Sequence, residues 1–186
     1  IIISDCIFLN NSATAWGGAF YSSGTQPNMI ENGASQHPEY DVEYSFQEIY
    51  FINTVFAGNI APNGGGALYI RGSQDVVVTN SEFIHNVVNG NFDGGAIYVY
   101  DGGSVSEITN CSFERNVAPH DGGAFYSATV LTNTLFKGSN FTSNSAGNNG
   151  GAVYVVAGST GVTFEDCKFN TNNAQVNGGA IYVDEG

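Results

Sequence analysis

A sixfold repeat constrains the fold of this chain more than any other feature. The tripeptide Gly-Gly-Ala occurs six times, each time after a Phe-x-x-Asn motif at a nearly constant distance. Between the last four copies the step is 28 residues each time. Such a period is typical of stacked supersecondary units, none of which can bury its apolar face alone. The motif pairs are Phe8/Asn11, Phe56/Asn59, Phe83/Asn86, Phe113/Asn116, Phe141/Asn144 and Phe169/Asn172.

The residues between the motifs predict strands. Short alternating runs rich in Val, Ile, Phe and Tyr are separated by Gly and Asn, and no stretch carries the apolar stripe of an amphipathic helix. We therefore predict an all-β fold, a single-stranded parallel β-helix (β-solenoid) with about 28 residues per coil. We expect three strands in each of about six to seven coils. Residues 1–186 are expected to form one segment of a longer protein, with an irregular insertion at about 22–48.

Stacking converts each motif position into a column, because neighbouring coils lie about 4.8 Å apart. The Phe column is expected to fill the interior, and the Asn column to bond neighbouring coils at a bend. The glycines allow a positive φ and close approach at a second corner. A Tyr column two residues before Arg71 and Asp184 is expected to form an exposed aromatic stripe, with an inward column as the alternative. Its members are Tyr21, Tyr69, Tyr98, Tyr126, Tyr154 and Tyr182.

The three cysteines fall in one column. Cys6, Cys111 and Cys167 belong to the first, fourth and sixth motif copies, so no two lie in adjacent coils. Two coils correspond to about 10 Å, beyond the roughly 7 Å between Cα atoms that a disulfide spans. We predict three buried free thiols that act as small apolar residues, with a metal or redox role as the alternative.

The charge of the chain excludes some classes of function. The formal net charge is −13, and only four residues are Lys or Arg. Phosphate binding needs clustered basic residues, so we exclude nucleic acid as a partner and disfavour an anionic membrane surface. No apolar run is long enough to span a membrane. An acidic surface suits an extracellular setting.

The repeat resembles a known one. Phe-x-x-Asn combined with Gly-Gly-Ala and Ile, Leu or Val is similar to the repeat of the polymorphic outer membrane proteins (Pmp) of chlamydiae, and of secreted algal and protist β-helix proteins. The likeness covers the chain apart from the insertion, and Phe20 and Phe125 depart from it. It implies a right-handed β-helix in a surface-exposed passenger domain with an adhesive or structural role.

Two sets of acidic residues are candidate sites. In the insertion, Glu39, Asp41 and Glu43 would suit a calcium ion, although a solvated loop or an irregular coil is the simpler interpretation. Asp93 and Asp121 precede Gly-Gly in adjacent coils, so their carboxylates are expected about 5 Å apart, as in retaining glycosidases. Asn occupies the same position in two later coils, so a turn role is the simpler interpretation of both acids.

Basic residues and sequons complete the candidates. His85 and Arg115 share a column on adjacent coils, with Glu114 beside Arg115, and a polysaccharide lyase would need such a base. Charge pairing on a solvated face is the simpler interpretation. Three Asn-x-Ser/Thr sequons are glycosylation candidates in a eukaryotic secretory host: Asn10, Asn110 and Asn140.

Together these features favour an extracellular structural or adhesive β-solenoid segment rather than an enzyme. Its expected partners are neighbouring subunits or flanking repeats of the same protein, glycans, or a cell-surface receptor. No cofactor is expected, with calcium as the alternative. The competing hypothesis is a carbohydrate-active β-helix enzyme, either a polysaccharide lyase or a glycoside hydrolase, because such enzymes share the fold.

Overall fold

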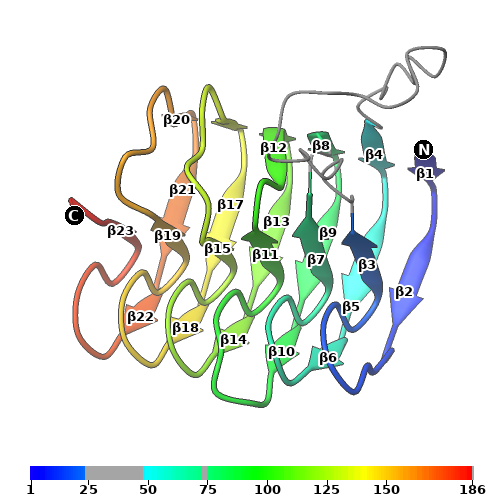
Figure 1. Cartoon of the computed structure of the whole chain (residues 1–186), viewed down its shortest axis with the longest axis horizontal. Coiled ribbons are helices and arrows are strands. Elements are labelled where there is room, and N and C mark those ends of the chain that lie inside the picture. The colour runs from blue at the N-terminus through cyan, green and yellow to red at the C-terminus, as the bar shows by residue number, and fades with distance from the viewer. Residues whose placement is uncertain (24–47, 73–74, 186) are drawn as a thin grey trace, which may run out of the picture.

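The chain folds into a parallel β-solenoid. The computed structural model describes residues 1–23, 48–72 and 75–185, and the regular structure of these residues is entirely β. No helix that could span a membrane occurs among them. Each strand pairs in parallel with the equivalent strand of the next coil, as Phe8 with Phe56 and Phe56 with Phe83. Figure 1 shows the coils side by side, from the N-terminus at the right to the C-terminus at the left.

The strands form four sheets, here called A to D, that run along the solenoid. Sheet A contains β1 (Ile2–Ser4), β4 (Ile49–Ile52), β8 (Asp75–Thr79), β12 (Ser104–Thr109), β16 (Leu135–Lys137) and β20 (Thr163–Glu165). Sheet B contains β2 (Ile7–Leu9), β5 (Val55–Ala57), β9 (Glu82–Ile84), β13 (Ser112–Glu114), β17 (Asn140–Thr142) and β21 (Lys168–Asn170).

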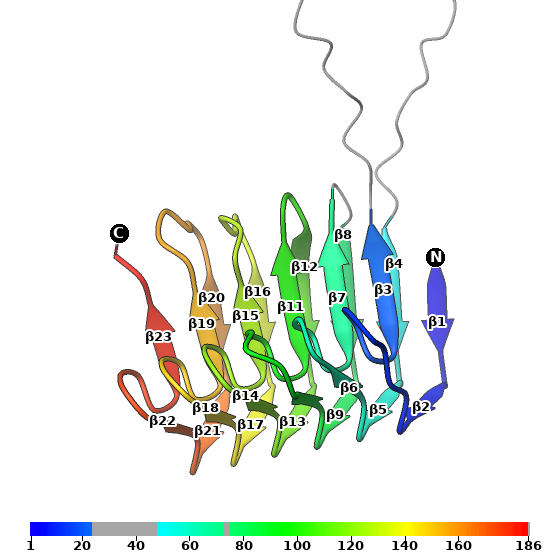
Figure 2. The ribbon, with the colours of Figure 1, turned by 60° about the horizontal axis from the view of Figure 1, so that its bottom comes forward.

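Sheet C is narrow, and sheet D completes each coil (Figure 2). Sheet C contains β6 (Ile60–Ala61), β10 (Val87–Val88), β14 (Val117–Ala118), β18 (Ser145–Ala146) and β22 (Asn173–Ala174). Sheet D contains β3 (Phe20–Ser23), β7 (Leu68–Arg71), β11 (Ile97–Tyr100), β15 (Phe125–Ser127), β19 (Val153–Val155) and β23 (Ile181–Val183).

The predicted parallel solenoid is confirmed, with two differences in detail. Sheets A, B and D hold six strands each, so the chain makes about five turns between equivalent strands, slightly fewer than expected. Coils that contain a sheet C strand have four strands, not three. The prediction missed this strand because its two residues are too few to show an alternating pattern.

Left-handed backbone conformations make three corners in every coil. One corner lies three residues before the motif Phe, as at Asn110 (φ 53°), and another two residues after it, as at Arg115 (φ 53°). The third is the first glycine of Gly-Gly-Ala, as at Gly122 (φ 63°). Asn, Asp and Gly adopt this conformation at the lowest cost, which explains why they alone occupy the first and third corners. The corners limit the strands to a few residues and close the coil.

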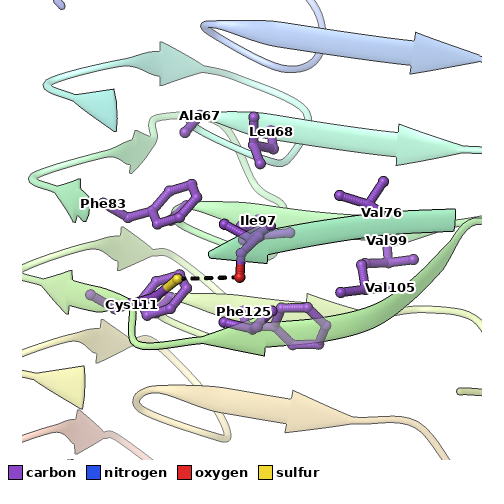
Figure 3. Packing of buried hydrophobic residues seen from close by; sticks show 14 of the residues in the cluster. Ala67, Leu68, Val76, Phe83, Ile97, Val99, Val105, Cys111 and Phe125 are labelled. Carbon is purple, nitrogen blue, oxygen red and sulfur yellow. Dashed lines mark hydrogen bonds between the residues drawn. The ribbon is translucent and has the colours of Figure 1, made fainter. Parts of the chain in front are cut away.

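The core is a column of apolar side chains enclosed by the four sheets. Figure 3 shows residues from several coils, among them Phe83, Ile97 and Phe125, directed into the same interior. Each of these three side chains is fully buried. Burial of one such side chain stabilises the fold by about 1.5–3 kcal/mol. The interior is therefore filled, and candidate binding residues must lie on the outer surface or at the corners.

Candidate functional site

The motif phenylalanines form one continuous stack inside the solenoid. Neighbouring ring centroids are 4.7–4.9 Å apart, and neighbouring ring planes lie within 8° of each other. Phe83 and Phe113 in the middle of the stack are fully buried, whereas Phe8 and Phe169 in the end coils are only partly buried. The stack packs the coils at one spacing and in one register.

The motif asparagines form a hydrogen-bonded ladder beside this stack. Oδ1 of Asn86 accepts hydrogen bonds from the backbone N–H of Asn59 (3.1 Å) and from its Nδ2 (2.9 Å). Nδ2 of Asn86 donates to the Phe56 carbonyl (2.9 Å) and to Oδ1 of Asn116 (3.0 Å). Both donors and both acceptor positions of this buried amide are thus satisfied. The same pattern joins each motif Asn to the next.

The ladder is not uniform, because Asn11 differs from the inner asparagines in its exposure. This residue does bond the next coil, because its backbone N–H (3.0 Å) and its Nδ2 (2.9 Å) both donate to Oδ1 of Asn59. Its side chain is nevertheless exposed, whereas Asn59 and Asn86 are fully buried. The reason is its place in the first coil, where the described residues supply a neighbouring coil on one side only. Asn11 therefore acts as a solvated end of the ladder and contributes less than an inner rung.

The cysteines are free, but not all are buried. Cys111 is 2% exposed, and its Sγ donates to the Val78 carbonyl (3.5 Å; Figure 3). Burial raises the pKa of the Cys111 thiol to about 12, which makes it unreactive. The prediction of burial is wrong for Cys6 and Cys167, which are partly exposed because they lie in the two end coils. Among the described residues, no group of three or more metal-ligating side chains comes together.

The tyrosine column lies outside the core, yet most of it is not exposed. Tyr69 alternates with the buried Leu68 and Ile70, so its ring projects from the outer face of sheet D. Neighbouring rings in the column have centroids 4.8–5.5 Å apart. Tyr21 is 42% exposed, whereas Tyr69 is only 4% and Tyr98 only 7% exposed. The prediction of an exposed stripe is therefore wrong for the column as a whole.

Mutual stacking and the glycine corner explain this burial. Rings that repeat at the coil spacing cover each other's faces, and the corner covers part of their sides. A Cβ at Gly64 would lie 2.9 Å from a ring carbon of Tyr98. Burial raises the pKa of Tyr69 to about 12 and also raises that of Tyr98 and Tyr154, the last being 8% exposed. The phenols therefore stay neutral at physiological pH.

The paired acids Asp93 and Asp121 act as corner residues. Oδ1 of Asp93 accepts a hydrogen bond from the Asp121 backbone N–H (3.0 Å), and Oδ1 of Asp121 accepts one from the Asn149 N–H (2.7 Å). Asn177 continues the column by donating from Nδ2 to Oδ1 of Asn149 (3.0 Å). Burial raises the pKa of Asp93, and the charge of Asp121 adds to this shift. Each carboxylate therefore bonds the neighbouring coil, which is the role of a turn residue.

Replacing Asp93 with asparagine should preserve this corner. The amide oxygen accepts the same hydrogen bond, so we expect the free energy of unfolding at pH 7 to change by less than about 1 kcal/mol. A raised folded-state pKa means that the folded wild type binds the proton more tightly, so its stability increases as pH falls through that pKa. The melting temperature of wild type, relative to that of Asp93→Asn, should therefore be higher at pH 4 than at pH 7. A large loss at pH 7 would instead indicate a role for the negative charge.

The basic candidates sit at another corner column. His85 and Arg115 both have φ of 53°, and the Arg115 guanidinium lies 2.7 Å from Oε1 of Glu114. The two side chains of this ion pair are 57% and 36% exposed, so the pair contributes at most about 1 kcal/mol. This geometry matches charge pairing on a solvated face.

The remaining candidates are surface residues or lie outside the described part. The sequon residues Asn10, Asn110 and Asn140 are all exposed, so a glycan on any of them would extend into solvent. The proposed calcium ligands Glu39, Asp41 and Glu43 lie outside the described residues.

Reasoning from the sequence missed an apolar patch on the outer faces of sheets A and B. The residues that point outward from these sheets in the first two coils are almost all apolar, and Ile7 (71% exposed) and Leu9 (59%) are the most prominent in sheet B. The apolar outer patch comprises Ile2, Ile7, Leu9, Tyr50, Ile52, Val55 and Ala57.

The same columns are polar in the last three coils. Parallel pairing places Leu9 in one column with Glu114 and Thr142, and Ile52 in one column with Thr109. Only Leu135 is apolar among the outward residues of these later strands, which are Ser104, Ser106, Glu107, Thr109, Ser112, Glu114, Leu135, Lys137, Asn140, Thr142, Thr163, Glu165, Lys168 and Asn170. The fold therefore does not require apolar residues here, and a patch of this kind marks an interaction surface.

Comparison with protein families gives a match that extends over the whole chain. The model described as "Right handed beta helix region" matches residues 1–186. The chain belongs to the right-handed β-helix family. Searches of curated proteins and of solved structures found no significant match.

Membership of the right-handed β-helix family accounts for the interior of this chain but not for its outer surface. The Phe stack and the Asn ladder hold the coils together, and the motif repeat that predicts them is visible in the sequence. The outer patch could have been found by comparing outward columns coil by coil, because the strand pattern already distinguishes the two faces. The candidate functional site of this right-handed β-helix is its outer surface over the first coils.

Proposed function

We propose that this chain is an extracellular structural or adhesive β-solenoid segment of a surface protein, fibre or appendage. The observation that carries the proposal is the apolar outer patch, which occupies columns of sheets A and B that are polar in the last three coils. The Phe stack and the Asn ladder support the structural role, because they make a stiff rod that holds a contact surface in place. The Phe-x-x-Asn and Gly-Gly-Ala repeat supports a place among Pmp-type repeats, and the acidic composition supports an extracellular location.

The partner that best fits the patch is a neighbouring subunit of the same protein. The seven side chains carry no charge, whereas the whole chain has a net charge of −13, so two copies repel each other least when they meet through this face. Flat sheet faces with apolar side chains pack on one another at about 10 Å, as in β-sandwiches. A two-fold contact would bring the patch against its own copy.

Self-association should depend on the patch. In the double variant Leu9→Thr, Ile52→Thr, each residue is replaced by the type found later in its own column, so the fold should be kept. We expect the dissociation constant measured by analytical ultracentrifugation to rise at least about tenfold, which corresponds to about 1.4 kcal/mol. Leu135→Thr is the matched control, because Leu135 points outward in the fifth coil beyond the patch. A monomeric wild type, or an equal effect of the control, would contradict the proposal.

We also propose that the segment is not an enzyme. In support, Asp93 and Asp121 bond the backbone of the next coil, and Arg115 pairs with its neighbour Glu114. Incubation with pectin, polygalacturonate and neutral polysaccharides tests this directly. Release of unsaturated products or of new reducing ends would favour the polysaccharide lyase or the glycoside hydrolase instead.

A further inference from the structure

Exposed aromatic side chains gather on the outer face of sheet D in the first three coils. Trp16 and Tyr21 are each 42% exposed, and Tyr100 is 40% exposed. The ring of Trp16 lies 6.1 Å from that of Tyr21 and 5.8 Å from that of Tyr69, centroid to centroid. Tyr100 lies 6.2 Å from Tyr69 and 6.0 Å from Tyr98. These five rings form one connected set of contacts, here called the aromatic platform, in which Trp16, Tyr21 and Tyr100 are exposed and Tyr69 and Tyr98 lie buried between them.

The fold does not demand the two outermost rings of this platform. Trp16 precedes the motif Gly-Gly, where the other five coils have Gly64, Asp93, Asp121, Asn149 and Asn177. Tyr100 shares its column with Arg71 and Ser23. Trp16 and Tyr100 are thus large aromatic residues at positions where small or polar residues serve the corner and the strand equally well.

An ion pair lies at the edge of the platform. Nη2 of Arg71 is 2.9 Å and its Nε 3.1 Å from Oδ2 of Asp101, and the Arg71 guanidinium lies 5.8 Å from the centroid of the Tyr100 ring. Both side chains of the pair are about half exposed, at 45% and 57%. The pair is neutral as a whole, yet a guanidinium has five N–H donors and a carboxylate about four acceptor positions. Donors and acceptors therefore stand beside aromatic rings.

We propose that the aromatic platform binds a neutral glycan. The C–H faces of sugar rings would pack on Trp16 and Tyr100, while sugar hydroxyls bond to the Arg71–Asp101 pair. Tyr and Trp suit such a surface because each combines an apolar ring with a polar edge. The net charge of −13 disfavours acidic glycans. This inference rests on the proposed contact function and names the ligand class for a second face of the same rod.

The single tryptophan of the chain makes the test specific. Trp16 is the only Trp, so the intrinsic tryptophan fluorescence reports on the platform alone. We expect cellohexaose, laminarihexaose or mannohexaose to change this fluorescence in a saturable way, and hexagalacturonate to leave it unchanged. Calorimetry should give the same dissociation constant for the neutral ligand. No response to any neutral probe, or equally tight binding of the acidic one, would overturn the proposal.

Three variants locate the binding site. The variants Trp16→Ala and Tyr100→Ala should each weaken neutral glycan binding at least tenfold. Calorimetry measures binding by Trp16→Ala, because this variant has lost the fluorescent residue. Phe92→Ala should bind normally, because Phe92 is equally exposed at 42% but has no ring contact with the platform in the described part of the chain. All three should keep the wild-type melting temperature and self-association. Undiminished glycan binding by both platform variants would overturn the proposal.

Self-association separates this proposal from the contact function. Weaker self-association in the platform variants would also overturn the glycan proposal, because it would show that a second copy occupies the platform. Failure of glycan binding leaves the patch test with Leu9→Thr, Ile52→Thr unaffected, so the failure of one proposal can be distinguished from the failure of the other.

Discussion

Replacing Gly123 with alanine is expected to destabilise the solenoid by about 4 kcal/mol or more, enough to unfold many domains of this size. Gly123 is the second glycine of its motif, and a Cβ there would lie 2.1 Å from the Gly151 carbonyl oxygen and 2.7 Å from backbone atoms of Ser145. All of these atoms belong to the backbone of the next coil, so no side-chain movement can relieve the clash. Urea unfolding monitored by circular dichroism measures the loss.

Gly179→Ala is the matched control for this prediction. Gly179 has the same place in the sixth motif, but the nearest atom to its added Cβ is the Asn172 carbonyl oxygen at 3.5 Å, an ordinary contact. We expect the free energy of unfolding of residues 1–186 to change by less than about 1 kcal/mol. An equal loss in both variants would show that the glycine acts through its backbone conformation rather than through the approach of the next coil.

Removing one step of the asparagine ladder should have a similarly large effect. In Asn116→Ala, the N–H and Nδ2 groups of Asn86 lose their acceptor, at 3.0 Å each, and the Phe83 carbonyl loses a donor at 2.9 Å. Oδ1 of Asn144 loses one of its donors as well. Each buried group left unsatisfied costs about 1–3 kcal/mol, so we expect a loss of about 4 kcal/mol in urea unfolding.

The aspartate variant of the same residue adds a pH dependence to this prediction. In Asn116→Asp the new carboxylate would face the Phe83 carbonyl and Oδ1 of Asn144, both acceptors, which raises its pKa above the ordinary value. The folded state then binds the proton more tightly than the unfolded state, so stability rises as pH falls through the raised pKa. As the pH is lowered from 7 to 4, the melting temperature of Asn116→Asp should therefore approach that of wild type. The control is Asn140→Ala on the exposed face of β17, which should lower the free energy of unfolding by less than about 0.5 kcal/mol at either pH. A loss as large as that of Asn116→Ala would contradict a specific role of the ladder.

The interior could be predicted from the sequence because its determinants repeat. Phe83 and Asn86 recur at one spacing in all copies, and stacking of identical positions follows once the coils are parallel. The exposure of Asn11 and the burial of Tyr98 could not be predicted in the same way. The repeat fixes the direction of a side chain, but the exposure of that side chain depends on how completely the neighbouring coils cover it. A neighbouring coil covers Asn11 on one side, whereas Tyr98 is covered on both sides.

The candidate site was less accessible to such reasoning than the core. The acids Asp93 and Asp121 were correctly placed in adjacent coils, but only the structure shows that their oxygens accept backbone N–H groups. The outer patch lies in columns where residue type changes along the chain, as from Leu9 to Glu114, so the repeat itself conceals it. A search for repeated motif positions finds the residues that hold the rod together and passes over those that contact partners.

The alternation of inward and outward residues in each three-residue strand has a consequence for how this protein can change. Stacking is specified by inner positions such as Phe113, whereas its neighbours Ser112 and Glu114 take no part in the core. Mutations can therefore replace the outward residues of one coil at a time while the fold stays the same. A lineage of such rods could acquire new recognition properties without refolding, and a designer could graft a chosen epitope onto any of its turns.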